Sequence, residues 1–383
     1  MTDASMESAS SRLRSIDIVR GLVCALMAID HVRVYAAVPA GGPDPAVFFT
    51  RWVTHFVAPA FCFFAGTGAF FLGRKLGDTR ALARFLVSRG LLLVLLELTL
   101  IRFFWTFNFD YRNYVLAGVI WMLGWCMALL ALFVRFTPRT VGIVGVSIVS
   151  LQQLFLLPPR ALPAIAPFWA FLYPSNAAPA FGIAVLYVLV PWIGVMAAGY
   201  GFGLIMQKEP AERRRLCLRI GLSATGVFLV VSTLLAALGT HGDDAPPMLM
   251  RMLNQQKYPA SQLFLLMTLG PAIALLPWAE RTRGWFASVM ETFGRVPMFY
   301  YLLHIPVIHI AAMVVSAIRT GGVVPQLVGN YPLAPPQMPD GYRWSLPLLY
   351  FVWAIVVFAV LYPSCRWYAA VKKRRPGGWL QYL

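Results

Sequence analysis

The first apolar segment of the chain carries an arginine and a histidine, Arg20 and His31, at a spacing that suits proton or group transfer. Cys24 and Met27 lie between them, so steps of four, three and four residues place all four on one helix face. A rise of about 1.5 Å per residue separates the two ends of this face by about 16 Å. A neutral imidazole takes a proton from an attacking amine or hydroxyl. The same pattern also fits packing, with Arg20 paired to Asp17 and His31 bonded to a neighbouring helix.

Other ionisable residues in apolar segments are candidates to act with His31. A charged side chain inside a membrane costs free energy, so such residues usually serve a function or form a structural pair. Asp30 adjoins His31 but points about 100° away around a helix, so it is expected to face Glu97 or Arg102 instead. His55 opens the second apolar segment and approaches His31 if the two segments pack as a hairpin. A carboxylate in this group would orient an imidazole.

A polar stripe is expected in the ninth apolar segment. Tyr300 and Tyr301 lie one helical turn before His304, and Arg295 precedes them. The tyrosines and the histidine either act on a substrate or satisfy one another inside a core.

The third apolar segment ends in a loop that mixes aromatic rings with Arg102, Asn108 and Asp110. Aromatic faces beside amide, acid and guanidinium groups suit a sugar acceptor, and Asp110 is a further carboxylate that would orient a histidine. The alternative interpretation is an aromatic belt at the membrane interface.

The composition requires lipid as the solvent for most of these segments. Of the 383 residues, 59% are hydrophobic and 12% are charged, whereas a soluble domain carries about 25% charged residues. Backbone amides in hydrocarbon must be satisfied within their own segment, which a helix achieves. The sequence therefore predicts an all-α, polytopic transmembrane helical bundle with about ten spans of about 20 residues, at 16–37, 51–72, 84–107, 114–136, 139–157, 183–206, 216–238, 260–279, 296–318 and 345–367.

The distribution of basic residues predicts the topology. Most of the 32 Lys and Arg residues lie in segments that ten spans place on one side, so both termini are expected in the cytoplasm, most simply at a bacterial inner membrane. The proline-rich segment 158–182 is expected to be external or re-entrant. One transmembrane domain, 15–370, is predicted between a cytoplasmic tail at 1–14 and a basic cytoplasmic tail at 371–383.

The net charge of +17 does not indicate a nucleic-acid partner, because most basic residues lie in short loops where lipid headgroups account for them. The five cysteines show no metal-ligand spacing, so neither a disulfide framework nor a metal site is expected. The expected partner is the lipid bilayer, and a homodimer is left open beside a monomer.

Two regions carry a resemblance to a known family. They read Arg14-Ser15-Ile16-Asp17-Ile18-Val19-Arg20-Gly21 with Met27-Ala28-Ile29-Asp30-His31, and Thr54-His55-Phe56-Val57-Ala58-Pro59 with Phe63-Phe64-Ala65-Gly66-Thr67-Gly68. They resemble the heparan-α-glucosaminide N-acetyltransferase-like catalytic family. The spacing of Arg20 and His31 is also similar to the first-helix signature of the related acyltransferase-3 membrane enzymes, and Arg295 with Tyr300, Tyr301 and His304 looks like a late-helix motif of the same family.

This resemblance implies a membrane acyltransferase. It would move an acyl group, most simply acetyl, from acetyl-CoA or another acyl-CoA in the cytoplasm to an amine or hydroxyl of a saccharide on the outer face. By the same resemblance His31 would act as base or acyl carrier, and Arg20 and Arg295 would hold the donor. The animal enzyme of the family has its key histidine in the loop between the first two spans, where this chain has none, so His31 and His55 both stay catalytic candidates beside Asp30.

Two other functions fit part of the pattern. A proton-coupled transporter would also place Asp30, His31 and Glu97 within its spans. Against a transporter, the sequence shows no internal repeat, and its predicted outer loops are longer than its inner ones. A membrane protein without chemistry would lose only stability on replacement of Arg20 and His31.

Overall fold

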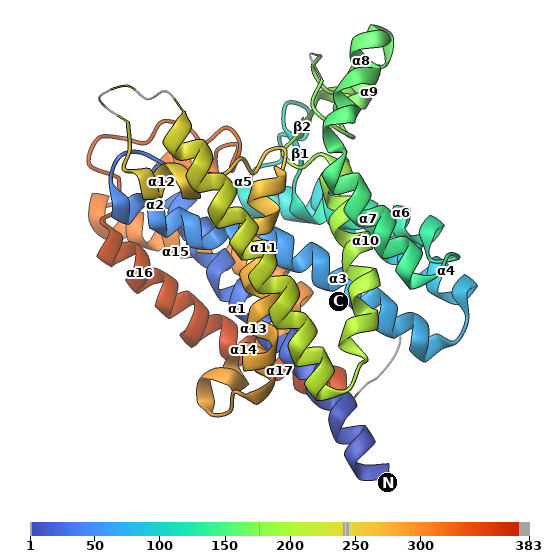
Figure 1. Cartoon of the computed structure of the whole chain (residues 1–383). Helices are drawn as coiled ribbons and strands as arrows, with labels where there is room; N and C mark the ends of the chain where they lie inside the picture. Colours follow the sequence, from blue (N-terminus) through green and yellow to red (C-terminus); the bar gives the residue numbers. More distant parts are fainter. Residues whose placement is uncertain (1, 176, 240–241, 243–244, 375–383) are drawn as a thin grey trace.

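The computed structural model describes residues 2–175, 177–239, 242 and 245–374, with side chains from residue 14 onward, and is built mostly of helices (Figure 1). Each of the ten predicted apolar segments falls largely on helix, which confirms the all-α, polytopic fold. In the first part of the chain the α-helices are α1 (Thr2–Tyr35), α2 (Pro45–Trp52), α3 (Val57–Leu76), α4 (Thr79–Leu96), α5 (Arg102–Thr106), α6 (Val119–Phe133), α7 (Pro138–Ser150), α8 (Leu157–Ala161) and α9 (Ala166–Trp169).

The second part of the chain continues the bundle. Its α-helices are α10 (Leu189–Met206), α11 (Pro210–Leu238), α12 (Met248–Leu253), α13 (Gln262–Arg281), α14 (Trp285–Arg295), α15 (Pro297–Thr320), α16 (Leu346–Ala354) and α17 (Tyr362–Arg374). Short 3₁₀ helices are η1 (Val53–Phe56), η3 (Gln152–Leu156), η4 (Pro163–Ile165), η5 (Ala180–Gly182) and η6 (Pro325–Val328), and two π-helical segments are η2 (Glu97–Ile101) and η7 (Ile355–Leu361).

Six helical segments in the described chain are long and apolar enough to cross a membrane, which supports an integral membrane protein. They are Pro45–Leu76, Leu189–Met206, Pro210–Leu238, Gln262–Arg281, Pro297–Thr320 and Leu346–Arg374. A bent pair, α7 with Gln152–Ala161 at 59°, adds a seventh if it forms one span. Helices α1 and α4 carry several charged residues within their apolar stretches, and α6 is shorter. The count of ten spans therefore stays a prediction.

The proline-rich segment 158–182 forms only short helical pieces and coil, as its composition predicts. Proline occupies one of the first two positions in each of α8, η4 and α9, where a missing backbone N–H costs nothing, and these pieces cannot merge into a long helix. In Figure 1, α8 and α9 project at the end of the bundle opposite the N-terminus. The segment thus lies beyond one end of the helical core.

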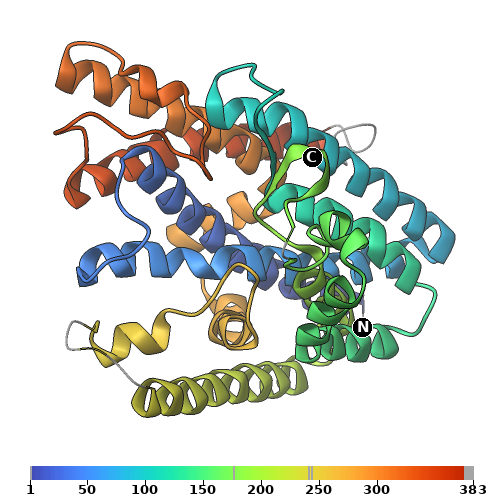
Figure 2. The same cartoon turned by 90° about the horizontal axis from the view of Figure 1, so that it is seen from above.

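Helix α1 is central and carries both Arg20 and His31. Helices α13, α14, α15, α3 and α16 all pack against it (Figure 2). Apolar residues on opposite sides of α1 are buried, among them Val19, Val23, Ala28 and Val32. A helix that buries opposite sides lies in the interior of a bundle. The rigid surroundings fix the two ends of its polar face.

Helices α1 and α14 approach so closely that only glycine fits at their crossing. A Cβ atom at Gly21 would overlap the carbonyl oxygen of Met290, and one at Gly294 would overlap the carbonyl oxygen of Asp17. Small residues let helix backbones come together in membrane proteins. This crossing sets the position of α1 near Arg20.

Replacing Gly294 with Val is expected to lower the stability of the protein by about 1–3 kcal/mol, because the added carbons must push α1 and α14 apart. Thermal unfolding in detergent, followed by tryptophan fluorescence, measures the change. The matched control is Gly226→Val in helix α11, where an added Cβ meets nothing within 4 Å. Equal melting temperatures for the two variants would contradict the close crossing.

A two-stranded parallel sheet joins two distant segments beside the helices. Strand β1 (Val115–Ala117) pairs with β2 (Ile183–Val185), with Val115 opposite Ile183. The pairing brings the start of α6 next to the start of α10. Leu116, Gly118 and Leu186, in or next to the two strands, form part of a cavity wall.

Candidate active site

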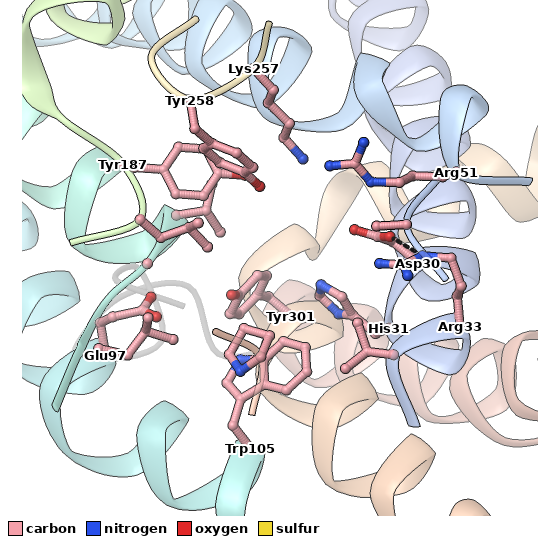
Figure 3. A pocket seen from close by; sticks show the side chains of 17 residues that line it. Asp30, His31, Arg33, Arg51, Glu97, Trp105, Tyr187, Lys257, Tyr258 and Tyr301 are labelled. Atoms are coloured by element: carbon pink, nitrogen blue, oxygen red, sulfur yellow. Dashed lines mark hydrogen bonds and ion pairs between the residues drawn. The ribbon is translucent and has the colours of Figure 1, made fainter. Parts of the chain in front are cut away.

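A cavity of about 200 Å³ lies at the end of α1 that carries His31 (Figure 3). Four of the predicted site residues line it, namely Asp30, His31, Glu97 and Tyr301. The other polar or aromatic side chains in its wall are Arg33, Arg51, Trp105, Tyr187, Lys257 and Tyr258. Residues from helices α1, α2, α5, α6 and α15, the π-helical segment η2, strand β1 and the loops beside them thus converge on one space.

Two histidines from distant segments are in direct contact at this cavity. Nδ1 of His31 in α1 lies 2.6 Å from Nε2 of His304 in α15, and the two rings stack with centroids 4.8 Å apart. His304 is fully buried behind His31, while His31 faces the cavity. The predicted polar stripe of α15 therefore supplies a partner for the histidine of α1.

The hydrogen bonds assign the tautomers of both rings. Nδ1 of His304 lies 2.6 Å from the carbonyl oxygen of Tyr301 and 3.2 Å from that of Tyr300. A carbonyl oxygen only accepts, so this nitrogen carries the proton and Nε2 of His304 is the acceptor. Nδ1 of His31 must then donate to it. A neutral His31 consequently keeps its lone pair on Nε2, the nitrogen available for a substrate.

Aromatic rings hold His31 in this orientation. Trp105 packs edge-on against it with ring centroids 4.7 Å apart. The hydroxyl of Tyr35 donates to the carbonyl oxygen of Trp105 at 2.6 Å, which ties α5 to α1. The imidazole is therefore held between a stacked ring and an edge-on ring.

Asp30 pairs with Arg33, one turn further along α1. The carboxylate oxygen lies 2.9 Å from Nε of Arg33. Arg102, which the sequence analysis considered as a partner, is engaged in another loop, and Glu97 occupies a different part of the cavity wall (Figure 3). The charge of Asp30 is thus partly matched before any ligand binds.

Glu97 reaches the start of α6 from a π-helical segment. Its Oε2 accepts from the backbone N–H of Ile120 at 2.9 Å and of Trp121 at 3.3 Å, where a helix N-terminus favours negative charge. Its Oε1 is buried and finds no partner among the described residues. A Cβ at Gly118 would overlap that oxygen, so a larger residue there would require the Glu97 side chain to shift.

The chain matches the family described as "Heparan-alpha-glucosaminide N-acetyltransferase, catalytic" over residues 12–236, more than half of its length. It belongs to this family. The matched region runs from α1 into α11 and includes Arg20, Asp30, His31, Arg51 and Glu97. No curated protein matches the chain. Membership supports a transferase-type enzyme within a helical membrane protein.

In this member of the acetyltransferase family, Arg20 lies near the middle of α1, outside the wall of the cavity. Its guanidinium donates to the carbonyl oxygen of Phe64 at 2.7 Å and lies 3.6 Å from the carboxylate of Asp17, so the predicted pair forms. Arg295 is exposed and pairs with Glu291, which also binds Arg14 at 2.9 Å. Arg20 and Arg295 are thus near one another in the fold but away from His31.

The remaining predicted residues lie outside the cavity wall. His55 is buried and packs against Phe264 with ring centroids 5.5 Å apart. Arg102 is fully buried and donates to the carbonyl oxygen of Tyr114 at 2.9 Å. The Asn108 amide donates to the carbonyl oxygen of Val328 at 2.8 Å, and Asp110 accepts from Asn113. In this structure these polar loop residues tie the backbone together.

The cationic side of the cavity does not follow from the sequence patterns above. Arg33, Arg51 and Lys257 lie in segments that the ten predicted spans place on the outer side. A departure from the positive-inside rule was the available signal, because basic residues on the outer side need another reason. In the described part of the chain, no group of three His, Cys, Asp or Glu residues is arranged to hold a metal ion.

Proposed function

We propose that this family member transfers an acetyl group from acetyl-CoA to an amine or hydroxyl of a glycan-type acceptor. The observation that carries the proposal is the chain of hydrogen bonds from the Tyr301 carbonyl through His304 to His31. It leaves a basic nitrogen beside a cavity, which is the arrangement that general base catalysis requires. The donor is expected from the cytoplasm and the acceptor from the outer face.

In the proposed reaction, Nε2 of His31 takes the proton from the acceptor as its nitrogen or oxygen forms a bond to the thioester carbonyl carbon. The carbon–sulfur bond then breaks, and the leaving thiolate receives that proton. The hydroxyl of Tyr301, which lines the same cavity, is placed to donate to the carbonyl oxygen as negative charge develops there. His304 accepts from Nδ1 of His31 throughout and keeps the ring in one orientation.

The donor phosphates would lie near Arg20, in the middle of α1. Ten residues of helix lie between Arg20 and His31, so eleven steps of about 1.5 Å place them about 16 Å apart, a distance that an extended pantetheine arm spans. Cys24 and Met27 lie between them and are buried, so α1 and its neighbours must part to admit that arm. The cation at Arg20 would attract the phosphates, as guanidinium groups do.

The direct test follows labelled acetyl-CoA with the purified protein in detergent and glucosamine as acceptor. We expect formation of N-acetylglucosamine and slow hydrolysis of the donor without acceptor. If the protein neither binds nor cleaves any acyl-CoA, the proposal is wrong, and proton-coupled uptake into vesicles becomes the next measurement.

Replacing Arg20 with Gln is expected to raise the Kd for acetyl-CoA by about tenfold or more, because one charge-assisted contact to phosphate is lost. Isothermal calorimetry with acetyl-CoA measures this change. The comparison is Arg295→Gln, the second arginine expected at the donor; because its side chain is far more exposed than that of Arg20, we expect a smaller rise in the Kd. An unchanged Kd in Arg20→Gln would remove Arg20 from the donor site.

A further inference from the structure

A buried histidine that the proposed reaction does not use joins three separate elements beside the cavity. His309 in α15 is fully buried. Its Nδ1 lies 3.1 Å from the carbonyl oxygen of Phe104 in α5, and its Nε2 lies 2.8 Å from the carbonyl oxygen of Leu327 in η6. The segment η6 belongs to loop 321–345, which runs from the end of α15 to the start of α16. One side chain thus connects α5, α15 and this loop.

The two contacts of His309 are both hydrogen bonds only when its ring carries two protons. A carbonyl oxygen only accepts, so each ring nitrogen must donate, whereas a neutral imidazole has one N–H and one lone pair. In the neutral ring, one nitrogen therefore presents a lone pair to a carbonyl oxygen at 2.8 or 3.1 Å. A second proton converts this repulsive contact into a charge-assisted hydrogen bond.

The rings that pack on His309 suit a cation. Phe107 and Tyr35 stack on the imidazole, with ring centroids 4.0 and 4.5 Å away. Aromatic faces attract a cation, and this attraction opposes the cost of burying the charge. Phe107 also has a left-handed backbone, with φ of 44°, which is strained for a residue other than glycine. Such strain persists only where the surrounding structure holds it, so the end of α5 depends on its packing against His309.

No carboxylate, lysine or arginine in the described part of the chain forms an ion pair with His309. From α1, the hydroxyl of Tyr35 lies 3.3 Å from Nδ1 and itself donates to the carbonyl oxygen of Trp105. From loop 321–345, Tyr331 packs on the Tyr35 ring. The charged and imidazole side chains of these elements bind other partners or are exposed, namely Asp30, His31 and Arg33 of α1, Arg102 of α5, His304 and Arg319 of α15, and Asp340 and Arg343 of the loop.

Both segments that His309 contacts reach the cavity. Pro332, five residues after Leu327 in loop 321–345, lines the cavity wall. Phe104 precedes Trp105, which lines the same wall and packs edge-on against His31. A change at the buried histidine of α15 would therefore move both the wall and the ring that holds His31.

We propose that His309 is a proton-dependent clasp. With two protons it donates to the carbonyl oxygens of both Phe104 and Leu327 and holds loop 321–345 in the cavity wall, and without the second proton the loop opens more often. Because the closed arrangement binds the extra proton, low pH favours closure and high pH favours opening. The inference concerns closure of the cavity and does not depend on which group is transferred.

The test measures how often loop 321–345 opens, from the rate at which a maleimide labels a cysteine placed in it. Leu327→Cys reports opening, because the side chain of Leu327 is fully buried and the backbone carbonyl that His309 contacts is kept. The matched control is Val323→Cys, because Val323 is 50% exposed in the same loop and reports the intrinsic reactivity of a thiol at each pH. The five native cysteines are buried, and the parent chain gives their background labelling.

We expect the labelling rate at position 327, divided by the rate at position 323, to rise about tenfold or more from about pH 5.5 to about pH 8.5. In His309→Gln the side-chain amide donates but does not titrate, so the ratio should be the same at both pH values. His309→Phe keeps a ring without a donor and should give a high ratio at both. His309→Asn is the second neutral variant, for use if thermal unfolding in detergent shows that His309→Gln does not fold.

Two results would overturn the inference. One is an equal ratio at the two pH values in the protein that keeps His309. The other is the same rise with pH in the folded His309→Gln or His309→Asn protein, which would assign the effect to another group. The labelling uses neither donor nor acceptor, so its outcome is independent of the proposed transfer reaction.

Discussion

Replacing His31 with Gln is expected to lower the kcat of acetyl transfer by about 10²–10⁴-fold, with little change in the Kd for acetyl-CoA. Nε2 of His31 is the nitrogen that the hydrogen bonds leave unprotonated beside the cavity, and glutamine has no basic nitrogen to take its place. Glutamine can still donate to His304, so the change removes the base with limited loss of packing. Steady-state transfer and calorimetry of donor binding measure the two quantities separately.

The matched control for this prediction is His55→Gln. His55 is the other catalytic candidate, but it is buried against Phe264 and does not line the cavity. We therefore expect it to affect stability more than kcat. If His55→Gln removed transfer while His31→Gln kept it, the assignment of the base to His31 would be wrong.

The local patterns that the sequence predicts are those that depend on a single helix. The shared face of Arg20 and His31 and the tyrosine–histidine stripe before Pro306 follow from helical spacing alone, and both are present in the structure. The pairing of Arg20 with Asp17 also needs only one turn of α1. Such short-range relations are set by the geometry of the α-helix.

The contacts that make the site are long-range and could not be read from spacing. His31 and His304 are 273 positions apart, and which α15 residue meets His31 depends on how two helices are rotated against each other. Lys257 lies in the loop between the short helix α12 and helix α13, where no periodic pattern predicts burial. The sequence indicates candidate residues, and packing selects among them.

Glu97 shows a second reason why the sequence alone does not predict the site. Its place at the start of α6 depends on a π-helical segment, in which one extra residue per turn rotates the side chain relative to an ordinary helix. The sequence predicts one regular helix over residues 84–107. A regular helix would point the Glu97 carboxylate in a different direction, so its position at α6 could not be predicted. The gap at Gly118 that admits it is visible only with both segments in place.

Replacing His304 with Leu is expected to lower kcat by about 10²-fold, although His304 is buried behind His31 and does not line the cavity. Leucine cannot accept from Nδ1 of His31. The imidazole is then free to carry its proton on either nitrogen, and the tautomer with a basic Nε2 is no longer enforced. His304 is thus a positioning residue that acts through His31.

The control for this prediction is His304→Gln, because a side-chain amide oxygen can accept from Nδ1 of His31 in the place of the imidazole. We expect the kcat of His304→Gln to be at least about tenfold higher than that of His304→Leu. Thermal unfolding is expected to show that both variants are folded. Equal kcat values for the two variants would mean that His304 serves packing alone. A higher kcat in His304→Gln would instead show that the position of the proton on His31 limits the reaction. Glutamine and leucine differ at this position chiefly in the ability to accept that hydrogen bond.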